Sequence, residues 1–331
     1  MESNTSDAES SSITRLDRVL LTQLVVKLLQ RKGMFVAEAE IVACRMIEAD
    51  QSGHGAEGVR TLPRLLEVLD LGDIDPRARL ITVTETPAIA VLDGSTGMGQ
   101  VAVTRAMLLA IEKAKVVGTG TVVVRNSQPC GDPGTYVRLA AEAGLIGFCT
   151  TSFGGSWLGG MSDQPFAWGL PAGEDGPVIW SKTCTRISVS ELDRCRDLGL
   201  PLPEGVALDE AGQVTTNAEQ VTDLVEAAPH WGLIQAHVLA VLAGGLAGGK
   251  PPFLKKKHAP FADDAEHFVL AIQPDLFGAA TRFASDWSGS LGELRSGLTH
   301  GTSSPDTVPV HPATTAQLKD LAAKIKFDVT W

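Results

Sequence analysis

Apolar residues recur at three- and four-residue steps along several stretches of the chain, with polar residues between them. This spacing places the apolar side chains on one face of a helix, so it predicts amphipathic helices. The first of these ends at Lys32-Gly33, a favourable helix stop, and the last begins with a threonine cap. The predicted helices cover residues 13–31, 36–49, 62–69, 99–115, 232–247 and 314–327.

Strand patterns concentrate in the middle of the chain. The β-branched run 121–124 and the segment 145–152 predict buried strands. Residues 81–95 predict a hairpin, with two short strands separated by Pro87 and an Asp93-Gly94 turn closing it. Helix-rich ends therefore flank a strand-rich middle.

Composition and charge exclude several classes of protein. The 331 residues are 44% hydrophobic and 20% charged, enough apolar material for two packed domains. A net charge of -11 argues against nucleic acid and anionic membranes as partners. No apolar run reaches the length of a membrane span. Residues 1–12 are acidic and serine-rich, which predicts a disordered tail where a signal peptide would be basic and then apolar.

The five cysteines are scattered without CxxC spacing and are odd in number. This pattern favours neither a zinc site nor a disulfide framework, so no metal is expected. It is typical of a reducing compartment, and we expect a cytoplasmic protein.

The stretch 50–64 (DQSGHGAEGVRTLPR) is the first candidate for chemistry. It is a glycine-broken polar turn between two predicted helices, and it carries His54, Glu57, Arg60 and Arg64. Its glycines would let the backbone come close to a bound ligand. The alternative is a plain helix–turn–helix connector with a solvated histidine.

A second polar loop covers residues 126–136, and a glycine-rich passage follows over residues 153–173. Such a passage can surround a ligand. It lacks both GxGxxG after a strand and GxxxxGK[ST], so the sequence supports neither a Rossmann nor a P-loop site.

Taken in order, several segments resemble the malate/L-lactate dehydrogenase-like family of NAD(P)-dependent oxidoreductases, which includes ureidoglycolate, sulfolactate and piperideine-2-carboxylate enzymes. The resemblance covers nearly the whole chain after the tail. The segments that carry it are LPRLLEVL (62–69), VLDGSTGMGQ (91–100), VVVRNSQPCGDPGTY (122–136), LPEGVALDEAGQVTT (202–216) and VLAGGLAGG (241–249).

The resemblance implies a mixed α/β, non-Rossmann fold. A central mixed sheet over residues 116–249 would bind the cofactor. Residues 13–115 and 250–331 would form a helix-rich domain from both chain ends, for dimerisation and substrate binding. It also implies a homodimer, or a heterodimer with an active relative, acting on a small carboxylate substrate.

The family's catalytic Ser-His-Gly motif and following arginine are replaced in this chain. Aligning on residues 62–69 places Ala56, Glu57, Gly58 and Thr61 at the serine, histidine, glycine and arginine positions. The resemblance then implies that Glu57 takes the place of the proton donor, with His54 three residues upstream. A glutamate can do this work if burial raises its pKa toward the working pH.

Substrate binding falls to the residues that follow. Arg60 or Arg64 would hold the substrate carboxylate by a bidentate pair, and Thr61 occupies the position of the family's arginine. The structural alternative for Glu57 is a solvated loop carboxylate.

The positions that contact the cofactor in the family have also changed. Its Asn-His-Phe-Gly motif reads Gln128-Pro129-Cys130-Gly131 here, and Trp231 replaces a lysine that can meet a cofactor phosphate. Thr151 is a further position that the resemblance assigns to cofactor binding. NADH or NADPH is therefore the implied cofactor, with weakened or absent binding.

Three functions remain open at this point, and whether the protein is an active enzyme is one of the open questions. The first is hydride transfer between NAD(P)H and a small 2-oxo, 2-hydroxy or cyclic imino acid. The second is a pseudoenzyme that keeps the scaffold as a binding or regulatory subunit. The third is cofactor-independent chemistry with Cys130, Glu57 and His54 as reactive groups, although nothing in the sequence lowers the pKa of that thiol.

Overall fold

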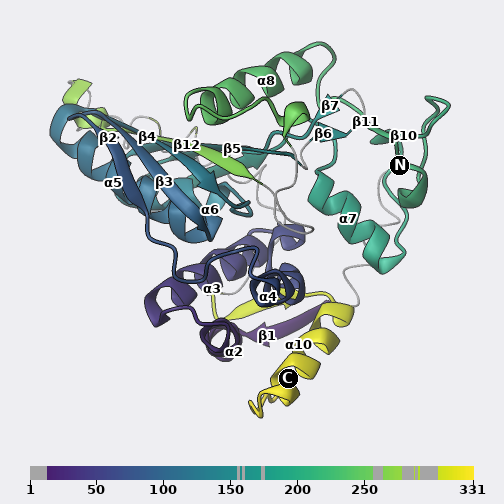
Figure 1. Cartoon of the computed structure of the whole chain (residues 1–331). Helices are drawn as coiled ribbons and strands as arrows, with labels where there is room; N and C mark the ends of the chain where they lie inside the picture. Colours follow the sequence, from purple (N-terminus) through teal and green to yellow (C-terminus); the bar gives the residue numbers. More distant parts are fainter. Residues whose placement is uncertain are drawn as a thin grey trace. The chain divides into compact units, whose positions relative to one another are not determined.

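A computed structural model describes residues 13–154, 157–158, 161–172, 176–255, 264–277, 287, 290 and 305–331. The expected disordered tail, residues 1–12, lies outside the described residues. The chain divides into two compact units, one of residues 1–72 with 299–331 and one of residues 73–298. In Figure 1 the first unit carries the purple and yellow ends of the chain.

The first unit is mainly helical and joins the two ends of the chain. Strand β1 pairs with β13 in an antiparallel ribbon, with Thr14 opposite Val310. The helices bury apolar side chains such as Leu24 of the first helix and Leu318 of the last. Its elements are β1 (Thr14–Asp17), α2 (Arg18–Arg31), α3 (Val36–Gln51), α4 (Leu62–Leu71), β13 (Thr307–Val310) and α10 (Pro312–Lys324).

Two predicted helix starts in this unit were wrong. The helix expected from residue 13 begins at Arg18, because Asp17 caps it by accepting a hydrogen bond from Leu20 N at 2.7 Å. The four residues before it are held extended by pairing with β13, a contact that local periodicity cannot indicate. The last helix begins at Pro312, and its cap is His311, whose Nδ1 accepts from Ala313 N, where a threonine was expected.

The second unit is built on a seven-stranded sheet in the order β2-β3-β4-β12-β5-β8-β9. Neighbouring strands pair antiparallel except for β3 and β4, which are parallel. The prediction of a mixed α/β architecture is therefore confirmed. The strands are β2 (Ile81–Glu85), β3 (Ile89–Gly97), β4 (Thr119–Ser127), β5 (Ile146–Phe153), β8 (Phe166–Leu170), β9 (Val178–Lys182) and β12 (Ala265–Ile272).

Helices cover both faces of this sheet, as Figure 1 shows, with α5 and α6 on one side and α8 on the other. The α5/α6 side buries a core that includes Met107, Tyr136 and Val269. The opposite side buries Leu239 of α8 and an aromatic cluster, in which the ring centroids of Phe148 and Trp168 lie 4.6 Å apart. The helices are α5 (Gly99–Val117), α6 (Gly134–Glu142), α7 (Val189–Leu198) and α8 (Trp231–Ala240).

Short elements complete the second unit. Helix α8 continues directly into a π-helical turn, η6, where the sequence predicted one uninterrupted helix to residue 247. These elements are β6 (Trp157–Leu158), β7 (Met161–Ser162), β10 (Ala207–Leu208), η5 (Ala218–Gln220), β11 (Asp223–Leu224), η6 (Val241–Gly245), η7 (Pro252–Leu254) and η8 (Pro274–Phe277).

The unit boundaries differ from the predicted domain boundaries. Residues 73–115 and 250–298 were assigned to the helix-rich domain, yet they belong to the sheet unit. The reason is strand pairing, since β2 and β3 extend the sheet at one edge and β12 enters its centre between β4 and β5. The predicted hairpin is present, but Asp93 and Gly94 lie inside β3 and do not form its turn.

Candidate active site

The loop between α3 and α4 consists of two short 3-10 turns, η1 (Gly55–Glu57) and η2 (Val59–Thr61). Helix α3 ends where the backbone N–H of Ser52 donates to Glu48 O at 2.9 Å. Gly53 then takes a φ of 82°, a left-handed conformation that glycine adopts without strain. Helix α4 resumes with a proline in its first turn. The predicted polar turn between two helices is confirmed.

Asp50, in the last turn of α3, fixes the backbone of this loop. Its side chain is buried, and Oδ2 accepts a hydrogen bond from Val59 N at 2.8 Å. A Cβ at Gly58 would collide with the carboxyl group, so a residue without a side chain is required there. Burial raises the pKa of Asp50 from 3.8 to about 8, only partly opposed by the Val59 hydrogen bond. The loop is therefore built around a carboxyl group that is largely neutral at pH 7.

The residues predicted to do chemistry lie on this loop. Glu57 is half-buried in η1, and its backbone N–H donates to the carbonyl oxygen of His54 at 2.9 Å. Arg60 is half-buried in η2, whereas Arg64 is exposed in the first turn of α4. The hydroxyl of Thr61 donates to Gly58 O at 2.8 Å. The structure thus places Glu57 and Arg60 on one short loop and Arg64 at the start of the helix that follows it, and their roles stay predictions.

The second candidate loop follows β4 in the sheet unit. Gln128 and Cys130 are buried, and Gly131 takes a φ of 76°. The phenol of Tyr136 donates a short hydrogen bond to Cys130 O. The loop also lies against Gly99, where a Cβ would collide with the Gln128 carbonyl oxygen. These contacts hold the backbone of the loop firmly.

His267 of β12 contacts this loop and was not among the predicted site residues. Its Nε2 is 3.1 Å from Gln128 O and 3.2 Å from Ser127 Oγ, and its Nδ1 is 2.8 Å from Thr151 Oγ1. A carbonyl oxygen can only accept, so Nε2 carries the proton and Nδ1 accepts from the threonine hydroxyl. Burial lowers the pKa of His267 from 6.5 to about 3, so the ring is neutral.

Two of the predicted cofactor residues are therefore linked. The His267 ring lies between them, because its Nε2 contacts the carbonyl oxygen of Gln128 and its Nδ1 contacts the hydroxyl of Thr151. Both residues are buried, so neither presents its side chain to solvent. Cys130, at 1% exposure, is buried as well, which favours a packing role over the nucleophilic role considered above.

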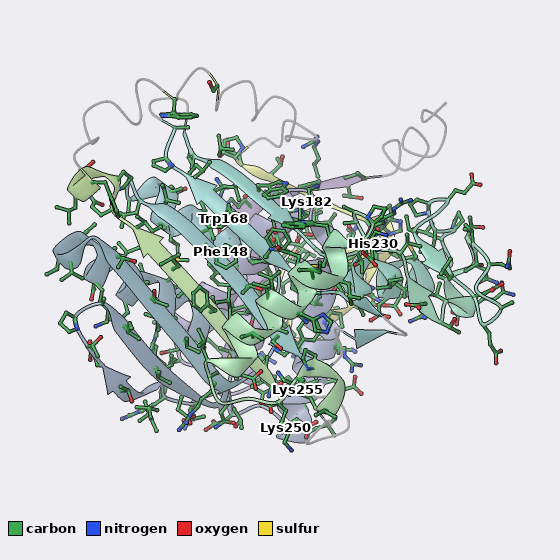
Figure 2. All side chains as sticks on the ribbon, turned by 90° about the horizontal axis from the view of Figure 1, so that it is seen from above. Phe148, Trp168, Lys182, His230, Lys250 and Lys255 are labelled. Atoms are coloured by element: carbon green, nitrogen blue, oxygen red, sulfur yellow. The ribbon has the colours of Figure 1, made fainter. Side chains whose placement is uncertain are left out.

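Trp231 lies apart from this buried group. It is the first residue of α8 and is 63% exposed. Figure 2 shows α8 crossing the sheet, with His230 just before its start and Lys250 and Lys255 beyond its end. Among the predicted cofactor residues of this unit, Trp231 is the one that presents its side chain to the surroundings.

A buried ion pair lies on the opposite face of β12 from His267. Lys255 donates to the carboxylate of Glu266 and also to Ser152 O at 2.8 Å. Burial raises the pKa of Glu266 from 4.5 to about 7, although the lysine opposes the shift. Gly249 has no space for a Cβ because the Glu266 carboxylate fills it. This pair fastens the segment after α8 to the sheet.

Sequence reasoning missed Asp50, His267, Glu266 and Ser127. A signal exists for His267 and Glu266, which interrupt the apolar strand 265–272 and so must be satisfied if the strand is buried. Asp50 resembles any polar residue at a helix end, and nothing in its local sequence indicates burial.

The family-model comparison identifies the chain. Residues 17–329 match the model of the malate/L-lactate dehydrogenase family, and the chain belongs to that family. A malate dehydrogenase of Pyrococcus abyssi is 30% identical over 302 residues, which cover 86% of this chain and 83% of the relative.

Solved structures agree on the fold. A malate dehydrogenase from Entamoeba histolytica superposes with a TM-score of 0.83 at 21% identity, covering 96% of this chain and 100% of that one. The Δ1-piperideine-2-carboxylate reductase from Pseudomonas syringae gives a TM-score of 0.79 at 22% identity, with 93% and 100% covered. The resemblance noted in the sequence is confirmed at the level of family.

Two features are absent from the residues that the structure describes. No three His, Cys, Asp or Glu side chains gather in a way that could hold a metal ion. Over the same part of the chain, no helix combines the length and apolar character needed to cross a membrane.

Proposed function

We propose that this protein transfers hydride between a nicotinamide cofactor and a small 2-oxo, 2-hydroxy or cyclic imino acid. The observation that carries the proposal is the family match, which extends over residues 17–329 and includes both candidate loops. Relatives in the family are named for malate, and a structural neighbour is named for piperideine-2-carboxylate. These names indicate the substrate class, a small carboxylate whose α-carbon carries an oxygen or a nitrogen.

In this proposal Glu57 holds the proton. As a carboxylic acid it would donate to the carbonyl oxygen or imine nitrogen during reduction, and as a carboxylate it would accept the proton in the reverse direction. His54 lies at the start of the same turn and would assist. Arg60 or Arg64 would bind the substrate carboxylate, because a guanidinium matches its two oxygens.

The loop is suited to this work because its backbone is fixed. The Asp50 carboxyl group and the absence of a Gly58 side chain set the path of residues 55–59 without using any exposed polar group. A fixed turn keeps the Glu57 side chain in a narrow range of positions, which favours proton transfer.

The sheet unit has features that fit a polar cofactor. Gln100 Oε1 and Thr104 Oγ1 are buried one helical turn apart on α5 and have no hydrogen-bond partner among the described residues. Gln100 follows Gly99, against which the Gln128 loop lies. A bound molecule could satisfy these oxygens. A nicotinamide cofactor would supply or accept the hydride.

We further propose that cofactor binding is weaker than is usual in the family. Trp231 offers an exposed ring and no charge at the position where the family has a lysine. Gln128, Cys130 and Thr151 are buried, so they would act by holding the loop backbone.

Two measurements test the proposal. Purified protein would be titrated with NADH and with NADPH by fluorescence and calorimetry. It would then be assayed for oxidation of each cofactor with a panel of small 2-oxo and cyclic imino acids. Turnover with any member of the panel supports the proposal. Absence of both turnover and binding would overturn it and favour a scaffold role instead.

A further inference from the structure

Two buried oxygens on α5 lack a hydrogen-bond partner in the described part of the chain. They are Gln100 Oε1 and Thr104 Oγ1, and the residues that carry them are 9% and 6% exposed. The two residues are four apart, so their side chains lie on the same face of the helix. Leu108, the next residue of this row, is 46% exposed. Thr104 is therefore about one helical turn from the protein surface.

The hydroxyl of Thr104 does not bond to the backbone of its own helix. A helical threonine often donates its hydroxyl to the carbonyl oxygen four residues earlier. Thr22 of α2 does so, donating to Arg18 O at 2.7 Å. Thr315 of α10 does the same, donating to His311 O at 3.2 Å. Since Thr104 makes no such contact within the described residues, its hydroxyl can bond to a group that the chain itself does not supply.

Both side chains are directed to the beginning of α5. This helix starts one residue after β3 and connects β3 to β4, the parallel pair of the sheet. Ligands of open α/β sheets bind where such a helix begins, at the carboxyl ends of the strands. Side chains of a helix lean toward its N-terminus, so those of Gln100 and Thr104 lean toward this end. The unpartnered oxygens and the topology of the sheet thus indicate the same place.

The neighbouring backbone contributes further acceptors. A Cβ on Gly99, the first residue of α5, would collide with the carbonyl oxygens of Gln128 and Pro129. Together with Gln100 Oε1, these oxygens make the place rich in acceptors. A phosphate or carboxylate has no proton to donate to them, whereas a neutral group with N–H donors does. The chemistry of the site therefore favours a neutral amide over an anion.

We propose that Gln100 and Thr104 bind the carboxamide of the nicotinamide ring, an inference that rests on the proposed function. A carboxamide has an NH2 group, which would donate to Gln100 Oε1, and a carbonyl oxygen, which would accept from Thr104 Oγ1. One planar group would satisfy both buried oxygens, because the helical spacing places them side by side. The phosphates of the cofactor, which only accept, would bind away from the acceptors at this end of α5.

The first test compares three ligands of the wild-type protein by calorimetric titration. They are NAD+, its nicotinic acid analogue, which has a carboxylate in place of the carboxamide, and ADP-ribose, which lacks the ring. NAD+ should bind about tenfold or more tightly than the nicotinic acid analogue, because a carboxylate cannot donate to Gln100 Oε1. If NADPH binds better than NADH, the corresponding phosphorylated forms replace these three.

The second test uses Thr104→Val, which keeps the shape of the side chain, and Gln100→Leu. Each removes one hydrogen bond to the carboxamide, so the affinity for NAD+ should fall by about three- to tenfold while that for ADP-ribose stays unchanged. Thr104→Ser keeps the hydroxyl and should retain the wild-type affinity. Thr22→Val is the matched control, because it removes a helical hydroxyl that already has a partner, and it should leave both affinities unchanged.

Urea unfolding without ligand gives a readout that is independent of binding. The hydroxyl of Thr104 has no partner in the described structure, so Thr104→Val should not lower the midpoint of unfolding. Thr22→Val should lower it, because that hydroxyl donates to a carbonyl oxygen. A lower midpoint for Thr104→Val would show that the chain itself satisfies this hydroxyl, which overturns the inference.

The binding outcomes separate this inference from the proposed function. Turnover with unchanged NAD+ affinity in both variants would overturn the inference alone, as would an equal loss of NAD+ and ADP-ribose binding. Equal wild-type affinity for NAD+ and the nicotinic acid analogue would also overturn it. The expected pattern of binding without turnover of any substrate would support the inference and reject the reaction. If none of the three ligands binds, the inference and the proposed function are both overturned.

Discussion

Asp50 Oδ2 accepts the backbone N–H of Val59 at 2.8 Å, which ties the last turn of α3 to the second turn of the candidate loop. The carboxyl group occupies the space that a side chain at Gly58 would need. A single buried acid therefore determines the path of the segment that carries Glu57. The same contact makes the stability of the protein depend on pH.

Asp50→Asn should change that dependence. Burial raises the pKa of Asp50 from 3.8 to about 8 in the folded protein, so the folded state binds the proton more tightly than the unfolded state. The favourable contribution is complete at acid pH and is lost as the pH rises from about 4 to about 8. Asparagine keeps an acceptor for Val59 N and cannot ionise. Across this range the wild-type free energy of unfolding should fall by on the order of a few kcal/mol relative to the variant.

Urea unfolding of both proteins at about pH 5 and about pH 9 measures this difference. Glu67→Gln, an exposed carboxylate on α4, is the control and should behave alike at both pH values. An equal gap between wild type and Asp50→Asn at the two pH values would contradict the argument.

The sequence predicted those helices whose bounds depend on the local spacing of apolar residues. Helices α3, α4 and α5 follow from their apolar spacing and lie close to their expected bounds. Strand β1 was missed because its partner, β13, comes from the other end of the chain. The compact unit that contains the sheet takes in β12, which the sequence placed in the helix-rich domain, because that strand joins the sheet from far along the sequence.

The sequence located one of the candidate loops but not the buried residues that fix its backbone. Glycines and polar residues indicated the loop that carries Glu57 and His54. Asp50 is buried against the backbone of its own loop, and His267 is held between segments far apart in the sequence, so neither burial can be read from the residues next to them. Residue type therefore located groups that can react, but not the groups that position them.

His267→Phe tests the buried contact in the sheet unit. Phenylalanine would fill the space but leave Gln128 O without its donor, so the free energy of unfolding should fall by about 1–3 kcal/mol. Because its pKa is lowered to about 3, His267 should stabilise the folded state most above pH 6.5 and less as the pH falls below that value.

Denaturant unfolding at neutral and acid pH would measure both effects. His237→Gln, an exposed substitution, should stay within about 0.5 kcal/mol of wild type. A neutral effect of His267→Phe at pH 7 would show that the contact does not hold the loop.

Trp231→Lys tests the proposed weakness of cofactor binding. A lysine at the start of α8 would restore a charge-assisted contact to a cofactor phosphate, worth on the order of 1.5–3 kcal/mol, or about ten- to a hundredfold in affinity. Calorimetric titration with NADPH would detect the gain. Val19→Lys adds the same charge elsewhere and should leave affinity unchanged. Submicromolar binding by the wild type would remove the basis for this prediction.

Glu57→Gln tests the proton donor. The two side chains have nearly the same shape, and the half-buried position of Glu57 in η1 should tolerate the change without unfolding the loop. Glutamine has no proton to give, so turnover with the best substrate of the panel should drop by roughly a hundredfold or more, with cofactor affinity unchanged. Reduced-cofactor absorbance under saturating substrate measures the rate.

Glu67→Gln is the matched control for charge, because it removes an exposed carboxylate from neighbouring α4 and should leave turnover unaffected. An unchanged rate in Glu57→Gln would reject this residue and direct attention to His54, which begins the same turn. His54→Gln would then be expected to show the loss instead. If both variants retain full turnover, the proton must come from outside this loop, and the assignment of residues 50–64 as the site of chemistry fails.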